Sequence, residues 1–98
     1  MSKPVYADYT NYMLRFYCKT CKVDLIDPID KLNWAVVDKV LHSLPEEDRN
    51  VIIDVYSKND TLSDNIYTTS KERKINQDKI WIIVSKVTNL IAKERLLI

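Results

Sequence analysis

Apolar residues recur along the chain mainly at intervals of three and four positions, and this spacing predicts an all-α fold of about five helices. The expected helices span about 5–17, 28–43, 44–57, 61–71 and 77–95. Ninety-eight residues fit one domain. We expect residues 1–98 to form that domain, with a helical pair at 5–43 and a C-terminal helix-turn-helix-like unit at 44–98.

The first predicted helix carries an aromatic stripe. Its members are Tyr9, Tyr12, Met13, Phe16 and Tyr17, which share one helical face. We expect this stripe to be core with its hydroxyls at the surface; the alternative is a groove that binds a partner.

The second predicted helix begins at Asp27-Pro28, where Asp27 caps free N–H groups and Pro28 lacks an N–H that would be unpaired anyway. Its expected buried positions are Ile29, Leu32, Val36, Val40 and Leu44, with Val37 and Leu41 on the flank. Trp34 lies well round the helix from this stripe. It therefore needs a neighbouring helix or a partner.

Capping signals predict where the third and fourth helices begin and end. Ser43 and Glu46 have the spacing of a capping box, and Thr61 is placed to cap the short fourth helix. Without glycine, Asn59 is the expected left-handed residue after the third helix. The expected inward residues are Ile52, Val55, Tyr56, Leu62 and Ile66.

The last predicted helix has the clearest amphipathic pattern. Its apolar stripe is Ile80, Ile83, Val84, Val87, Leu90 and Ile91. Its opposite face holds Asp78, Lys79, Ile82, Ser85, Lys86, Asn89 and Lys93.

The chain contains no glycine, which argues against most nucleotide-handling enzymes. Loops that cradle phosphates, dinucleotide fingerprints and the sharp turn that exposes a hydrolase serine all depend on glycine. The acidic clusters are explained by caps and helix dipoles. We therefore expect no enzymatic activity and no cofactor.

The cysteines and the single histidine suggest no metal or redox site. Cys18 and Cys21 have the spacing of half a zinc site, but the chain lacks a second cysteine pair. The pair would lie at the C-terminal end of a helix, where the dipole disfavours thiolate. We expect reduced, half-buried thiols, and His42 as a partly exposed surface residue.

Charge is distributed unevenly although the net charge is only +1. Residues 23–64 carry a net charge of −6 and residues 65–98 a net charge of +4, which favours an anionic partner for the C-terminal third. The apolar runs are short and the N-terminus has no signal-like stretch. We therefore expect a cytoplasmic protein with no membrane partner.

A short helix, a tight link and a basic-faced helix form the outline of a helix-turn-helix. The residues that extend this outline are Leu44, Pro45, Arg49, Tyr56, Thr61, Leu62, Asp64, Ile75, Asn76, Ile80 and Ile83. In this order they resemble region four of bacterial sigma factors, the part that reads the upstream promoter element. The size of the chain suits the small regulators of this type found on phages and mobile elements.

The resemblance implies double-stranded DNA as the partner and the last helix as its reader. Carried over by position, Gln77, Lys79, Trp81, Ile82 and Lys86 would face DNA, with Arg73 and Lys74 near backbone phosphates. Gln77 suits adenine, Lys79 and Lys86 suit phosphate or guanine, and Ile82 suits a thymine methyl group. RNA polymerase is a further partner that this family implies.

Two features depart from the family pattern. Glu72-Arg73-Lys74 stands where the family has a small residue and a glycine, which leaves the geometry of the turn open. Trp81 and Ile82 stand where polar or basic residues usually lie. An exposed apolar pair is also typical of a protein-binding face. The alternative function is therefore a helical interaction module or homodimer that uses Trp34, Trp81 and Ile82 without DNA contact.

Overall fold

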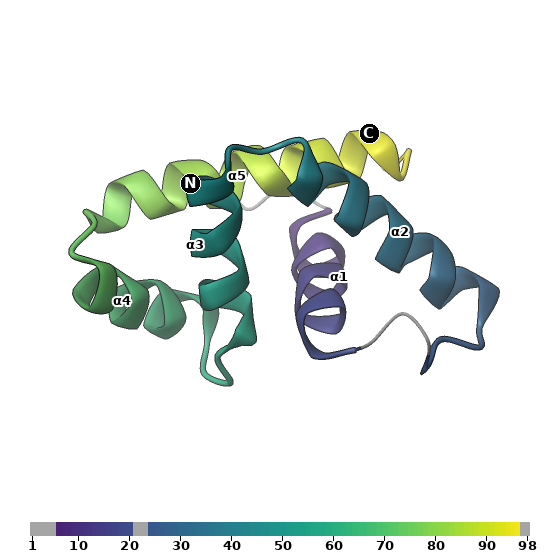
Figure 1. The fold of residues 1–98 in the computed structure, drawn as a ribbon, viewed down its shortest axis with the longest axis horizontal. Helices are drawn as coiled ribbons and strands as arrows, with labels where there is room; N and C mark the ends of the chain where they lie inside the picture. Colours follow the sequence, from purple (N-terminus) through teal and green to yellow (C-terminus); the bar gives the residue numbers. More distant parts are fainter. Residues whose placement is uncertain (1–5, 21–23, 97–98) are drawn as a thin grey trace.

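The computed structural model describes residues 6–20 and 24–96, and within them it contains five helices and no strand. The helices are α1 (Ala7–Lys19), α2 (Pro28–His42), α3 (Glu46–Ser57), α4 (Leu62–Arg73) and α5 (Gln77–Glu94) (Figure 1). The prediction of an all-α fold with five helices is confirmed, and each boundary lies within a few residues of the expected one.

Three polar side chains fix where helices begin. Asp27 accepts a hydrogen bond from the backbone N–H of Ile29 at 2.7 Å, and Thr61 accepts one from Asp64 at 3.2 Å. Both predicted caps are confirmed. Asn76 caps α5 in the same way, by accepting from the N–H of Asp78 at 2.8 Å. Each cap pairs an N–H group that has no partner within its helix.

Two other capping predictions are wrong. Ser43 ends α2 instead of starting α3: its hydroxyl donates to the carbonyl of Val40 at 2.6 Å, and α3 begins after Pro45 without a side-chain cap. The link between these helices is so short that Ser43 still belongs to the last turn of α2. Asn59 is not left-handed, because its φ is not positive, and the chain leaves α3 through an extended Lys58 (φ −79°, ψ 155°).

The longest helix, α5, organises the packing. In Figure 1 it runs along one side of the molecule, with α4 near its N-terminal end, α2 near its C-terminal end, and α1 and α3 between them. One core cluster draws on all five helices. Its fully buried side chains include Leu14, Val37, Leu41, Ile52, Val55, Tyr56, Ile66, Ile80, Val87 and Ile91. Within this cluster, the predicted stripe of α5 is confirmed, with Leu90 partly buried at its edge.

The expected core face of α1 is wrong for two of its five members. Tyr12 is 52% exposed and Tyr9 is also exposed, whereas Met13 is fully buried, Phe16 is partly buried and Tyr17 packs against the core. Leu14 and Thr10, on the neighbouring face, are completely buried instead. The reason is that α1 packs on three other helices, α2, α3 and α5, and these contacts select a different face from the aromatic one. Thr10 satisfies its hydroxyl by donating to the carbonyls of Tyr6 and Ala7.

The start of α2 also departs from expectation. Ile29 and Leu32 are exposed, whereas Val37 and Leu41, expected on the flank, are completely buried. Figure 1 shows the N-terminal end of α2 pointing away from α5, so the first turns of this helix have fewer neighbours to cover them. The apolar core therefore begins about two turns further along the helix than Ile29, near Val36 and Val37.

Candidate nucleic-acid interface

The turn between α4 and α5 closes without glycine. Lys74 takes the left-handed conformation (φ 56°, ψ 44°), and its backbone N–H donates to the carbonyl of Ser70. The N–H of Ile75 donates to the same carbonyl at 3.1 Å, and the hydroxyl of Ser70 donates back to the carbonyl of Ile75. The chain then enters α5 at Asn76. Lys74 thus adopts the left-handed conformation that glycine most readily provides at a helix C-terminus.

Replacing Lys74 with glycine is expected to raise the free energy of unfolding by about 1 kcal/mol, because glycine has no Cβ to strain a left-handed backbone. Urea denaturation followed by far-ultraviolet circular dichroism measures the change. The control is Lys74→Ala, which removes the same charge but keeps the Cβ atom. If both variants unfold at the same urea concentration, backbone strain at this position is not relieved by glycine.

The outward face of α5 carries three of the predicted base-reading residues, Lys79, Ile82 and Lys86, all of them exposed and Ile82 to 69%. Gln77 is also exposed, but it lies about 200° round the helix from Lys79 and so on another side of α5. Lys79 and Lys86 lie two helical turns apart, about 10.5 Å along the axis. Lys93 continues the row by two more turns and was not among the predicted site residues, although its seven-residue spacing was visible in the sequence. In the described part of the chain, these three lysines have no ion pair.

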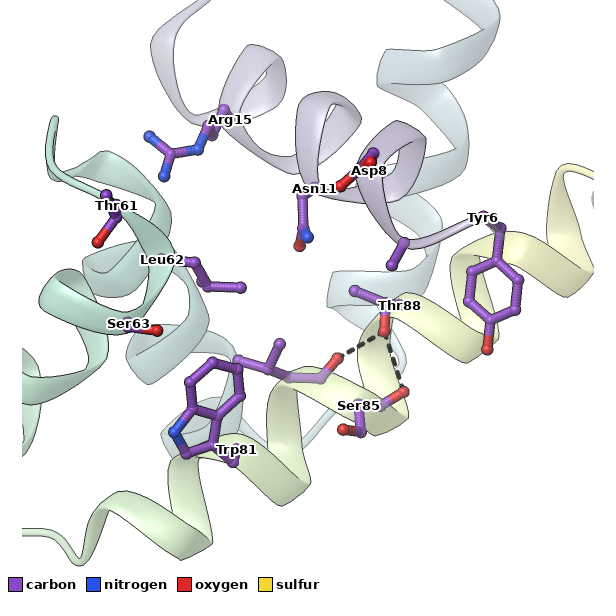
Figure 2. Close-up of a pocket in the computed structure, with 12 residues that line it drawn as sticks. Tyr6, Asp8, Asn11, Arg15, Thr61, Leu62, Ser63, Trp81, Ser85 and Thr88 are labelled. Atoms are coloured by element: carbon purple, nitrogen blue, oxygen red, sulfur yellow. Dashed lines mark hydrogen bonds between the residues drawn. The ribbon is translucent and has the colours of Figure 1, made fainter. Parts of the chain in front are cut away.

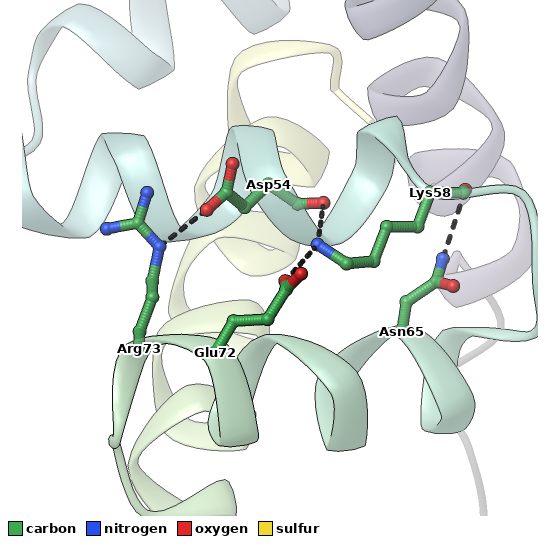
Figure 3. A network of polar contacts seen from close by, with 5 residues as sticks. All are labelled: Asp54, Lys58, Asn65, Glu72 and Arg73. Carbon is green, nitrogen blue, oxygen red and sulfur yellow. Dashed lines mark hydrogen bonds and ion pairs between the residues drawn. The ribbon is translucent and has the colours of Figure 1, made fainter.

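Arg73 and Lys74 are adjacent in the sequence but have different electrostatic environments. Arg73 Nε lies 2.5 Å from Asp54 Oδ2, so its charge is paired with α3 (Figure 3). A second ion pair, between Lys58 and Glu72 at 3.0 Å, also joins the C-terminal ends of α3 and α4. These pairs hold α4 against α3. Both residues are exposed, but Arg73 is engaged in the ion pair with Asp54, whereas Lys74 has no ion pair within the described residues.

Trp34 is accounted for within the molecule. Its ring lies 4.8 Å from that of Tyr17 between ring centroids, and its Nε1–H donates to the carbonyl of Thr20 at 3.2 Å. The hydroxyl of Tyr17 donates to Asp38 at 2.7 Å, and burial together with this carboxylate raises the pKa of Tyr17. Trp34 therefore joins α1 to α2. Of the two expected explanations for its position, a neighbouring helix or a partner, these contacts are with the neighbouring helix.

Trp81 and Ile82 do not form one apolar patch. Consecutive helical residues point about 100° apart, and only Ile82 lies at the centre of the outward face. Trp81 is turned toward a cleft bounded by α1, α4 and α5, where its ring forms part of the wall (Figure 2). Of the two, Ile82 lies on the surface that also carries Lys79 and Lys86.

Cys18 is a half-buried thiol near the end of α1, as expected, and Cys21 lies outside the described residues. Burial raises the pKa of Cys18, which disfavours the reactive thiolate form. His42 is exposed, with Nδ1 2.8 Å from the carbonyl oxygen of Asp38. Across residues 6–20 and 24–96, no group of three or more histidine, cysteine or acidic side chains is placed to hold a metal ion.

The fold and the exposed face of α5 define the class of the protein, a small all-α protein of five helices in its described residues. No protein-family model, no curated protein and no solved structure matches the sequence. None of the helices in the described ranges is long and apolar enough to cross a membrane.

Proposed function

We propose that the protein is a DNA-binding transcriptional regulator of the sigma region-four-like type, with α5 as the helix that enters the major groove. The observation that carries this proposal is the outward face of α5, on which Lys79, Ile82 and Lys86 are exposed and the two lysines lack ion pairs within the described chain. A cytoplasmic location and RNA polymerase as a second partner belong to the same proposal.

The arrangement of α4, the turn and α5 supports this function. In helix-turn-helix proteins the first residues of the second helix contact base edges, while the first helix crosses the backbone. Gln77 and Lys79 occupy the first turn of α5, and Ile82 lies one turn further along. A glutamine can pair with adenine through two hydrogen bonds, and an apolar side chain can contact the methyl group of thymine. The major groove, about 12 Å wide, admits a helix of this kind.

Phosphate contacts would come from residues around this face. Lys74 is exposed at the turn, and Lys86 and Lys93 lie further along the same side of α5. We leave Arg73 out of this set because its guanidinium is paired with Asp54. Four lysines are then available: Lys74, Lys79, Lys86 and Lys93. Each lysine that neutralises a phosphate releases a counterion from DNA and makes binding sensitive to salt.

The test is a titration of fluorescently labelled random duplex DNA with the protein, followed by anisotropy between about 50 and 200 mM salt. We expect binding that weakens with salt, with a slope of log Kobs against log salt of about −3 to −4, since each phosphate contact contributes about −0.9. Selection of preferred sites would follow. The absence of binding at 50 mM salt and about 100 μM protein would overturn the proposal, because nonspecific dissociation constants normally lie at or below that concentration.

A second candidate function is a helical interaction module or homodimer without DNA contact. It is favoured by Tyr9 and Tyr12, which are exposed on α1 with ring centroids 6.3 Å apart, and separately by the exposed Ile82 on α5, since large exposed apolar side chains are typical of protein-binding surfaces. This function requires no DNA binding at either salt concentration. The same titration therefore distinguishes the two candidates.

A further inference from the structure

A cleft of about 490 Å³ lies between the N-terminal half of α1, the start of α4 and the middle of α5 (Figure 2). Its volume falls within the range of sites that bind small molecules, about 300 to 1,000 Å³. The walls come from three segments far apart in the sequence, residues 6–15, 61–63 and 81–88. No motif in the sequence predicts the cleft, because only packing of the three helices brings these segments together.

One side of the cleft is apolar. Trp81 and Leu62 both extend into it in Figure 2, and Val84 also lines it. Trp81 is 37% exposed and lines the cleft, so part of its surface is accessible to a ligand there. An indole ring beside two aliphatic side chains offers a flat surface for an aromatic or branched aliphatic group.

A cation stands at the edge of this apolar wall. Arg15 donates one hydrogen bond, from Nη2 to the carbonyl of Asp60 at 2.9 Å, and no carboxylate in the described chain pairs with it. Its remaining N–H donors suit a carboxylate, which guanidinium groups bind through two parallel hydrogen bonds. Asp8 also lines the cleft, further along α1, and Arg15 is the one arginine or lysine among the described residues that line it, which suits a ligand with a single carboxylate.

From these features we infer that the cleft binds a small amphiphilic monocarboxylate, with its carboxylate on Arg15 and its apolar body against Trp81 and Leu62. Such a ligand would contact a charged group on α1 and an apolar surface on α4 and α5. The inference does not depend on DNA binding, and it concerns a different side of α5 from the row of lysines.

The probe for this site is 4-phenylbutyrate, and its primary amide is the uncharged comparison. Two-dimensional NMR of the ¹⁵N-labelled protein reports on the indole N–H groups of Trp81 and Trp34 separately. We expect 4-phenylbutyrate to shift the Trp81 signal saturably, with a dissociation constant of about 0.1–1 mM, and to leave the Trp34 signal in place. The amide is expected to bind at least about tenfold more weakly, because it lacks the charge that Arg15 recognises.

Variants separate the role of Arg15 from a general change in the protein. In Arg15→Gln the preference for carboxylate over amide is expected to disappear, whereas Arg49→Gln, which removes an arginine outside the cleft, should keep it. The amide spectrum of each variant shows whether it is folded. Unchanged preference in folded Arg15→Gln, equal binding of acid and amide to the natural protein, or equal shifts of both tryptophans would each overturn the inference. No shift at 10 mM probe would do the same.

Discussion

Replacing Lys79 and Lys86 together with glutamate is expected to weaken DNA binding about 50-fold or more at 0.1 M salt. The loss of two phosphate contacts, each worth nearly a decade in affinity at this salt concentration, accounts for this factor before any repulsion is counted. The slope of log Kobs against log salt should also become shallower by about two. Both residues are exposed and unpaired within the described chain, so the substitutions remove no contact that stabilises the fold.

The fold of the double variant is checked by circular dichroism. Lys79 lies in the first turn of α5, where a glutamate is favoured by the helix dipole, so helix content should be retained. The control reverses the charges of Lys19 and Lys31, two exposed lysines on α1 and α2, and changes the net charge by the same amount. Because Lys19 donates a hydrogen bond to Asn59 at 2.7 Å, the fold of this control is checked by circular dichroism as well. We expect this control to bind DNA much more tightly than the Lys79/Lys86 variant. Equal weakening in both would mean that net charge, rather than the outward face of α5, governs binding.

Truncating Leu14 to alanine is expected to lower the free energy of unfolding by about 3 kcal/mol, the usual cost of removing a fully buried leucine side chain. For a domain of this size the melting temperature should fall by more than about 10 °C. Leu14 is completely buried within the core cluster to which all five helices contribute. The substitution therefore leaves a cavity that is closed to solvent.

The comparison variant is Tyr12→Ala, on the aromatic stripe of the same helix. Tyr12 is half exposed and contacts the rings of Tyr9 and Phe16 at centroid distances of 6.3 and 6.1 Å. Losing these contacts should cost less than about 1 kcal/mol. Urea denaturation of both variants measures the difference. A larger loss for Tyr12→Ala than for Leu14→Ala would restore the aromatic stripe as the core face of α1 and contradict the packing described above.

The candidate interface was partly visible in the sequence. The exposed positions on α5 follow from its amphipathic pattern, and Lys79, Ile82 and Lys86 lie on the outward face as expected. Arg73 could not be assigned in this way, because its partner Asp54 is nineteen residues away on another helix. Trp81 and Ile82 are adjacent in the sequence, but their environments differ. Trp81 lines the cleft between α1, α4 and α5, whereas Ile82 is exposed to solvent.

Local signals in the amino-acid sequence were enough to predict the number and approximate bounds of the helices, the caps at Asp27 and Thr61, and the buried face of α5. These properties depend on interactions within a few residues of the chain or on one strong apolar stripe. The buried face of α1 and the cleft beside Trp81 depend instead on how the helices pack together. On α1 both the aromatic face and the Leu14 face are apolar enough to pack, and the choice between them is made by the helices that surround it.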